Sequence, residues 1–139
     1  MSIFIRLFLK DSQNGIVINS DYITHTWNDN KGRCIIYCDV TKGLPSKYEV
    51  SYSPKELFEL LYHVNNKFIR LTGPAFQDHH LFLLNTDYIV SLESNRDTGE
   101  CILHCNPSTG LQASYEVDSK FDNLLEHLYS INEDMCLFD

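Results

Sequence analysis

The sequence predicts an α+β protein built from two tandem ββββα repeats. Each repeat is expected to form an antiparallel sheet covered by one helix, and the two repeats to pack as an intramolecular pseudo-dimer. Two observations lead to this prediction: an internal repeat that spans nearly all of the 139 residues, and strand-like alternation followed by an amphipathic helix in each copy. The predicted parts are residues 1–66, residues 67–132, and an apolar C-terminal tail at 133–139.

The internal repeat is read from matches that occur in the same order in both halves. Three segments recur: Phe-Ile-Arg-Leu at 4–7 and 68–71, an Asn-x-Asp-Tyr-Ile pattern at 19–23 and 85–89, and, without a gap, 32–65 and 99–132. Chance does not produce this order of matches. A unit of about 65 residues buries a modest fraction of its surface and is only marginally stable alone, so the copies are expected to share a core.

Four strands are expected in the first copy because apolar and polar residues alternate and β-branched or aromatic residues are frequent. Their predicted ranges are 3–9, 16–27, 33–38 and 47–52. The second range contains the turn-prone trio Asn19, Ser20 and Asp21, so a bend is expected there.

A helix is expected directly after the fourth strand. Ser53 can cap it, Pro54 suits the first helical position, and Glu56 completes a capping box. Apolar residues at spacings of three and four place one stripe on the helix, which must cover a sheet. The stripe residues are Leu57, Phe58, Leu61 and Val64 in the first copy, and Phe121, Leu124, Leu125, Leu128 and Ile131 in the second.

The second face of the first strand carries aromatic residues. Arg6 alternates with Ile5 and Leu7, and it shares the outer face with Phe4 and Phe8. Such a face needs cover from the other copy or from another subunit. A homodimer with two-fold symmetry, or a higher homo-oligomer, is therefore expected, with the apolar tail as one candidate clasp.

Composition limits the function classes. The net charge is −8 and the pI is about 5.1, which argues against nucleic acid as a partner because phosphate binding needs clustered Lys and Arg. Residues 1–66 carry seven basic and seven acidic side chains, whereas 67–139 carry four and twelve. No apolar run is long enough for a membrane span, and no secretory signal opens the chain, so a cytoplasmic protein is expected.

The cysteines invite a zinc interpretation that strand geometry opposes. Cys34 with Cys38, and Cys101 with Cys105, are four residues apart on expected strands, a separation of about 13 Å. We therefore expect packing, with no metal and no cofactor. No known catalytic motif appears, so the chain is not expected to be an enzyme. His79-His80 is expected in a solvated loop.

Candidate ligand-binding residues come from the repeated Arg and from the loops between the third and fourth strands. Arg6 and Arg70 could grip an anion, or could instead pair with carboxylates such as Glu49 and Glu116. The loops at 39–46 and 106–114 both contain Gly-Leu, and their backbone N–H groups could hold an anion. The full candidate set is Arg6, Arg70, Tyr22, Tyr88, Thr41, Lys42, Gly43, Thr109 and Gly110.

The pattern Phe-Ile-Arg-Leu, then Asn-x-Asp-x-Ile, then Tyr-x-Val, then a Ser-led amphipathic helix resembles the small bacterial flagellar FlbD family and similar bacterial and phage proteins. The resemblance covers both copies. It implies a small non-enzymatic module. Two features depart from the family: the duplication, and the longer loop between the third and fourth strands.

Three functions remain open from the sequence. The first is a non-enzymatic binding protein that holds or sequesters a small anionic molecule, such as a nucleotide signal, at the seam between repeats or subunits. The alternative is a structural or regulatory adaptor that binds a partner protein through sheet edges. The third is a thiol enzyme or metal protein built on the cysteines.

Overall fold

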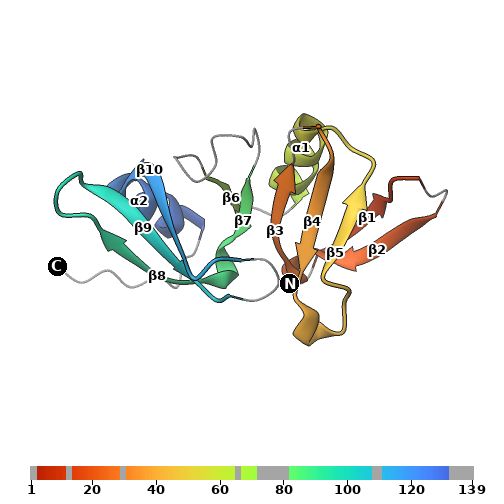
Figure 1. Cartoon of the computed structure of the whole chain (residues 1–139), viewed down its shortest axis with the longest axis horizontal. Coiled ribbons are helices and arrows are strands. Elements are labelled where there is room, and N and C mark those ends of the chain that lie inside the picture. The colour runs from red at the N-terminus through yellow and green to blue at the C-terminus, as the bar shows by residue number, and fades with distance from the viewer. Residues whose placement is uncertain are drawn as a thin grey trace.

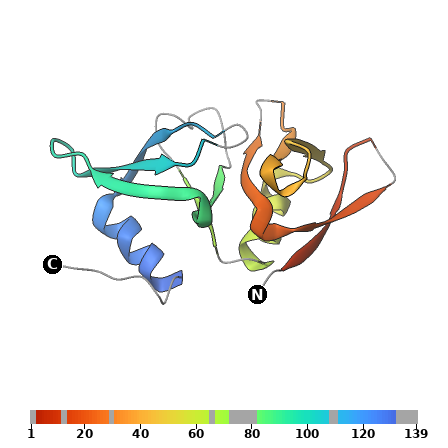
Figure 2. The ribbon, with the colours of Figure 1, turned by 90° about the horizontal axis from the view of Figure 1, so that it is seen from below.

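The protein is mainly β, and its described residues form three antiparallel sheets and two α-helices (Figure 1). The computed structural model describes residues 3–11, 14–28, 31–64, 67–71, 82–107 and 111–131. The two halves of the sequence lie side by side along the long axis of the molecule, as Figures 1 and 2 show. No described helix is both long and apolar enough to cross a membrane.

The strands, the α-helices and the 3-10 turns η1 and η4 follow the same order in both halves. The first half contains β1 (Phe4–Phe8), β2 (Gly15–Asn19), η1 (Ser20–Tyr22), β3 (Ile23–Asn28), β4 (Cys34–Cys38), η2 (Val40–Lys42), β5 (Lys47–Val50) and α1 (Pro54–Val64). The second half contains β6 (Phe68–Arg70), β7 (Leu83–Asn85), η4 (Thr86–Tyr88), β8 (Ile89–Ser94), β9 (Glu100–Cys105), β10 (Ser114–Lys120) and α2 (Phe121–Ile131).

The predicted second strand is two strands separated by a 3-10 turn, so each half has five strands among the described residues instead of four. The Asn19 side chain accepts a hydrogen bond from the Asp21 amide at 3.0 Å, and Asn85 accepts one from Asp87 at the same distance. These local bonds cap the turn and compete with the strand ladder. The bend expected at Asn19 is therefore a full break.

The expectation of one self-contained sheet per repeat is wrong. β1 and β2 form a two-stranded sheet, β10-β9-β8 a three-stranded sheet, and β5-β4-β3-β7-β6 a five-stranded sheet. The last sheet contains strands of both halves, because β7 pairs antiparallel with β3 where His25 faces Leu84. The β6–β7 hairpin therefore belongs to the sheet of the first half.

The start of α1 agrees with the sequence prediction. The Ser53 amide donates to Glu56 Oε1 at 3.1 Å, and the Glu56 amide donates to Ser53 Oγ at 3.2 Å. Together these bonds form the capping box and satisfy two backbone donors at the helix start.

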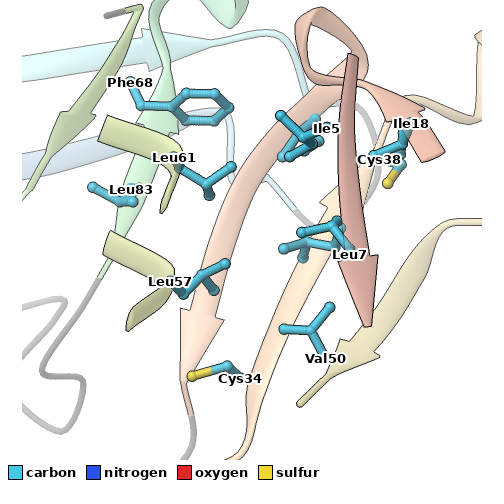
Figure 3. Close-up of a cluster of buried hydrophobic side chains, with 12 residues drawn as sticks. Ile5, Leu7, Ile18, Cys34, Cys38, Val50, Leu57, Leu61, Phe68 and Leu83 are labelled. Atoms are coloured by element: carbon cyan, nitrogen blue, oxygen red, sulfur yellow. The ribbon is translucent and has the colours of Figure 1, made fainter. Parts of the chain in front are cut away.

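Two hydrophobic clusters make up the core, one in each half. The first cluster includes Phe68 and Leu83 of the second half, which lie against Leu57 and Leu61 of α1 (Figure 3). The shared core predicted from the small repeat size is present, and the β6–β7 hairpin provides it.

The prediction that the paired cysteines pack in the core is confirmed. Cys34, Cys38, Cys101 and Cys105 are all buried, and none of these four forms a disulfide. They belong to the two hydrophobic clusters, and burial raises the pKa of the Cys38 and Cys105 thiols. Such thiols pack as small apolar side chains.

A buried asparagine joins the two halves. Asn85 Nδ2 donates to the carbonyl oxygens of Asp21 at 3.1 Å and Ile23 at 2.9 Å. Nearby, the Leu83 amide donates to Thr26 Oγ1 at 3.2 Å. These bonds satisfy polar groups beside β3 that burial would otherwise leave unpaired.

We predict that Asn85→Ala lowers the free energy of unfolding by about 2 kcal/mol more than Asn19→Ala, because two buried carbonyl groups lose their donor. The matched variant is informative because both asparagines cap a 3-10 turn, whereas only Asn85 also bonds to the other half. Urea unfolding of both variants measures the difference. Equal losses would show that the bonds between the halves contribute nothing net.

Candidate functional site

Five of the candidate residues gather around the η2 loop, where Asp39 is the central group. Asp39 Oδ1 accepts hydrogen bonds from the Thr41 amide at 2.9 Å and the Thr41 hydroxyl at 2.6 Å. Asp39 Oδ2 accepts one from the Tyr88 hydroxyl at 2.9 Å. The loop of the first half is thus bonded to a tyrosine of the second half.

The electrostatics of Asp39 follow from these contacts. Burial raises the pKa of the carboxyl, but hydrogen bonds from Thr41 and Tyr88 and the charge of Lys42 outweigh it, so the pKa lies below its usual value. Burial, followed by the bond to Asp39, raises the pKa of Tyr88. The Thr41 N–H that could bind an external anion therefore already donates its hydrogen bond to the Asp39 carboxylate.

The other loop candidates have structural contacts as well. Lys42 Nζ lies 5.6 Å from the centre of the Tyr22 ring. Gly43 ends the η2 turn with φ of 83°, a left-handed conformation that glycine adopts without strain. The assignment of Tyr22, Thr41, Lys42, Gly43 and Tyr88 as binding residues stays a prediction.

The repeated arginines lie away from this loop and on different elements. The Arg6 guanidinium carbon lies 5.1 Å from the centre of the Phe8 ring, whereas the suggested partner Glu49 faces Arg33 at 3.9 Å. Arg70 lines a cavity of about 310 Å³ between α1, β6 and α2. Their roles as ligand contacts remain predictions.

The remaining sequence predictions fall outside the described residues. These are Thr109 and Gly110 of the second loop, His79-His80, and the tail at 133–139.

His25 is a buried group that the sequence pattern did not reveal. Its ring stacks on Tyr37 with centroids 4.4 Å apart, and its Nδ1 lies 2.8 Å from Thr24 Oγ1. Burial lowers the pKa of His25 from 6.5 to about 3. Alternation in 23–28 does not mark this histidine, because both faces of β3 are covered there.

Lys67 holds the turns of the two halves together at the surface. Its Nζ lies 3.0 Å from Asp87 and 3.7 Å from Asp21. Both aspartates belong to the Asn-x-Asp motif that occurs in each half. This repeated motif is the feature of the sequence from which the contact could have been predicted.

Three exposed cations lie at one end of the first half. Strand pairing brings the turn after β1, the turn between β3 and β4 and the end of β5 together, since Leu9 bridges to Val50 and Cys34 also faces Val50. This end carries the exposed Lys10, Lys31 and Arg33.

The corresponding end of the second half has a different charge. The repeat places Thr98 and Glu100 where the first half has Lys31 and Arg33. The two ends therefore differ in charge at these two positions.

The fold is shared with a protein of known structure. No protein-family model and no curated protein matches the sequence. A solved structure does match: the LytTr DNA-binding domain of a methyl-accepting/DNA response regulator from Bacillus cereus, with a TM-score of 0.56 and 16% identity over 91% of this chain and 96% of that chain. The chain has a LytTr-like fold.

This match corrects several sequence predictions. The FlbD resemblance is wrong, because it is the LytTr domain that matches nearly the whole chain. The predicted binding of a small anionic molecule, the adaptor alternative and the exclusion of nucleic acid are overturned by the same match. The fold is a non-enzymatic one, as expected.

We predict that Tyr88→Phe lowers the free energy of unfolding by about 1.5–3 kcal/mol at neutral pH, the value of a hydrogen bond to a charged group. The folded-state pKa of Asp39 is depressed, so its stabilisation is present above the unfolded pKa and is lost as pH falls through the folded pKa. The gap between wild type and variant, followed by urea unfolding against pH, should therefore close in acid. A gap that stays constant into acid would show that the Asp39 charge is not involved.

A second prediction concerns His25. Because its pKa falls from 6.5 to about 3 on folding, only the unfolded state takes up a proton just below pH 6.5. Stability should decrease by up to roughly 1.4 kcal/mol per pH unit below that value. His25→Gln should flatten the slope between about pH 6.5 and 5 in thermal or urea unfolding. A variant that keeps the wild-type slope would place this pH dependence on another group.

Proposed function

We propose that the chain is a DNA-binding domain of the LytTr type. One observation carries the proposal: the fold is shared over 91% of this chain and 96% of a chain described as a LytTr DNA-binding domain. A cytoplasmic location goes with this proposal, because DNA would be met there. The four described cysteines also form no disulfide, as is usual in a reducing compartment.

The repeat supports a finer description of the domain. We infer that residues 1–66 and 67–132 are copies of one unit, because the order of two strands, a 3-10 turn, three strands and a helix occurs twice. The copies pack on each other through the β6–β7 hairpin.

The first copy is the better candidate for contact with the phosphate backbone. Phosphates are neutralised mainly by Lys and Arg, and seven of the eleven basic residues lie in residues 1–66. Lys10, Lys31 and Arg33 are exposed at one end of this copy. The second copy, residues 67–132, carries nine acidic residues and only four basic ones, and this charge would repel the backbone.

Arg33 can turn from its present partner toward a phosphate. Its contact with Glu49 is 3.9 Å long, and both side chains are about one-third or more exposed. Exposed pairs of this kind contribute little to stability, so the loss of the contact with Glu49 itself has a small cost.

Fluorescence anisotropy with a pool of randomised DNA duplexes, at low and moderate salt, tests the proposal. We expect binding, enrichment of particular sequences on repeated selection, and an affinity that falls as salt rises. The variant Lys31→Thr with Arg33→Glu gives the first copy the residues of the second. It should weaken binding and lower the salt slope by about 1 for each phosphate that is no longer neutralised.

The matched control changes the same positions in the second copy. Thr98→Lys with Glu100→Arg adds positive charge to the acidic half, and it should change affinity less than the first-copy variant does. Absence of binding to any duplex by the wild-type chain at low salt would contradict the proposed function. If the first-copy variant binds DNA as tightly as the wild type, DNA remains the ligand but its contact lies elsewhere on the protein.

A further inference from the structure

The β6–β7 hairpin has two apolar faces, and it packs against both halves of the chain. The β6–β7 hairpin presents Phe68 and Leu83, both 0% exposed, to Leu57 and Leu61 of the first half (Figure 3). The opposite face of the same hairpin, with Ile69 and Leu84, packs in the core of its own half. This hairpin thus has one face for its own half and one for a neighbouring half.

Among the described residues, the equivalent hairpin of the first half has no such neighbour. Its own-core face is filled by Ile5, Leu7 and Ile18. Its other face carries Phe4 and Val17, the repeat equivalents of Phe68 and Leu83, and these are 64% and 69% exposed. Residues that are fully buried in one copy are therefore open to solvent in the other.

The receiving strand shows the same contrast. On β3, which pairs with β7, Thr24 is 0% exposed. On β8, the repeat equivalent of β3, the matching Val90 is 69% exposed. Among the described residues β8 pairs only with β9, and β2 pairs only with β1. Within the part of the chain that the structure describes, there is therefore one open hairpin, β1–β2, and one open receiving edge, that of β8.

We propose that the β1–β2 hairpin of one molecule adds to the β8 edge of another, in the way that β6–β7 adds to β3 within the chain. Strand addition of this type satisfies backbone groups at an exposed edge and buries alternate side chains. The internal pairing of Leu84 with His25 sets the register, so Ile18 of one molecule faces Ser91 of the next. Phe4 and Val17 would then lie toward Leu124 and Leu128 of α2, the equivalents of Leu57 and Leu61.

Charge favours this head-to-tail arrangement over contact between like ends. Residues 1–66 are neutral, whereas residues 67–139 carry the whole charge of −8. Two β8 edges would bring two acidic halves together, which like-charge repulsion opposes. A head-to-tail contact joins a neutral half to an acidic half. It is heterologous, unlike the two-fold contact expected from the sequence, and it does not require DNA.

Light scattering over a range of protein concentrations, with two end-blocking variants, tests this contact. The wild-type chain should increase in mass progressively with concentration, because an open head-to-tail contact sets no fixed number of subunits. Val17→Lys blocks the hairpin and Val90→Lys blocks the edge, so each variant alone should be monomeric. An equal mixture of the two should form a 1:1 pair, because each retains the end that is blocked in the other.

The same measurement gives the control and the results that would overturn the proposal. Val40→Lys places the same charge at an exposed position of η2, outside β1, β2 and β8, and it should associate like the wild type. Circular dichroism of each variant checks that it folds. A wild-type chain that stays monomeric at every concentration, or a mixture of the two blocked variants that does not pair, would overturn the proposal.

Discussion

The pairing of the β6–β7 hairpin with β3 is the contact that holds the two halves of the chain together. It extends the sheet of the first half to five strands and places Phe68 and Leu83 in that half's core. Asn85 fixes the position, because its amide must reach the carbonyls of both Asp21 and Ile23. A unit of about 65 residues has a limited interior of its own, and this hairpin supplies the missing apolar surface.

The polar contacts at the seam depend on the same pairing. Once β7 lies beside β3, the turn that follows it brings Tyr88 within reach of Asp39 and Asp87 within reach of Lys67. Burial of His25 between Tyr37 and Phe82 also requires β7 in place, since Phe82 directly precedes that strand. A single geometric fit thus sets the environment of one carboxylate, one phenol and one imidazole.

Features encoded by neighbouring residues could be predicted from the sequence. The capping box at Ser53 and Glu56, the stripe on α1 and the inward cysteines are set by local spacing, and the structure has them. The sequence could not predict that the β6–β7 hairpin joins the sheet of the first half while β1 and β2 form a sheet of their own. Alternation of apolar and polar residues shows which side chains are buried, but it does not show which half buries them. Phe4 and Phe68 look alike in the sequence, yet one is exposed and the other fully buried.

The candidate site was predicted less well than the fold. The η2 loop does gather Thr41, Lys42 and Gly43 beside residues from both halves. However, the carboxylate of Asp39 fills the position in this loop that a bound anion was expected to take, and the sequence analysis did not recognise this role. Net charge also led to the wrong exclusion of nucleic acid. The net charge of −8 hides the fact that the two halves have very different charges. A net charge also says nothing about the fold.

The shared sheet also has a consequence for synthesis on the ribosome. The chain emerges from its N-terminus, so β3 is available well before residues 83–85 that complete its sheet. Until they appear, the edge of β3 and the apolar side chains of α1 lack their cover. Domains generally fold as units as they leave the ribosome, and here the first half cannot reach its final packing until the start of the second half has been made. The shared sheet therefore ties the maturation of the first half to the translation of the second.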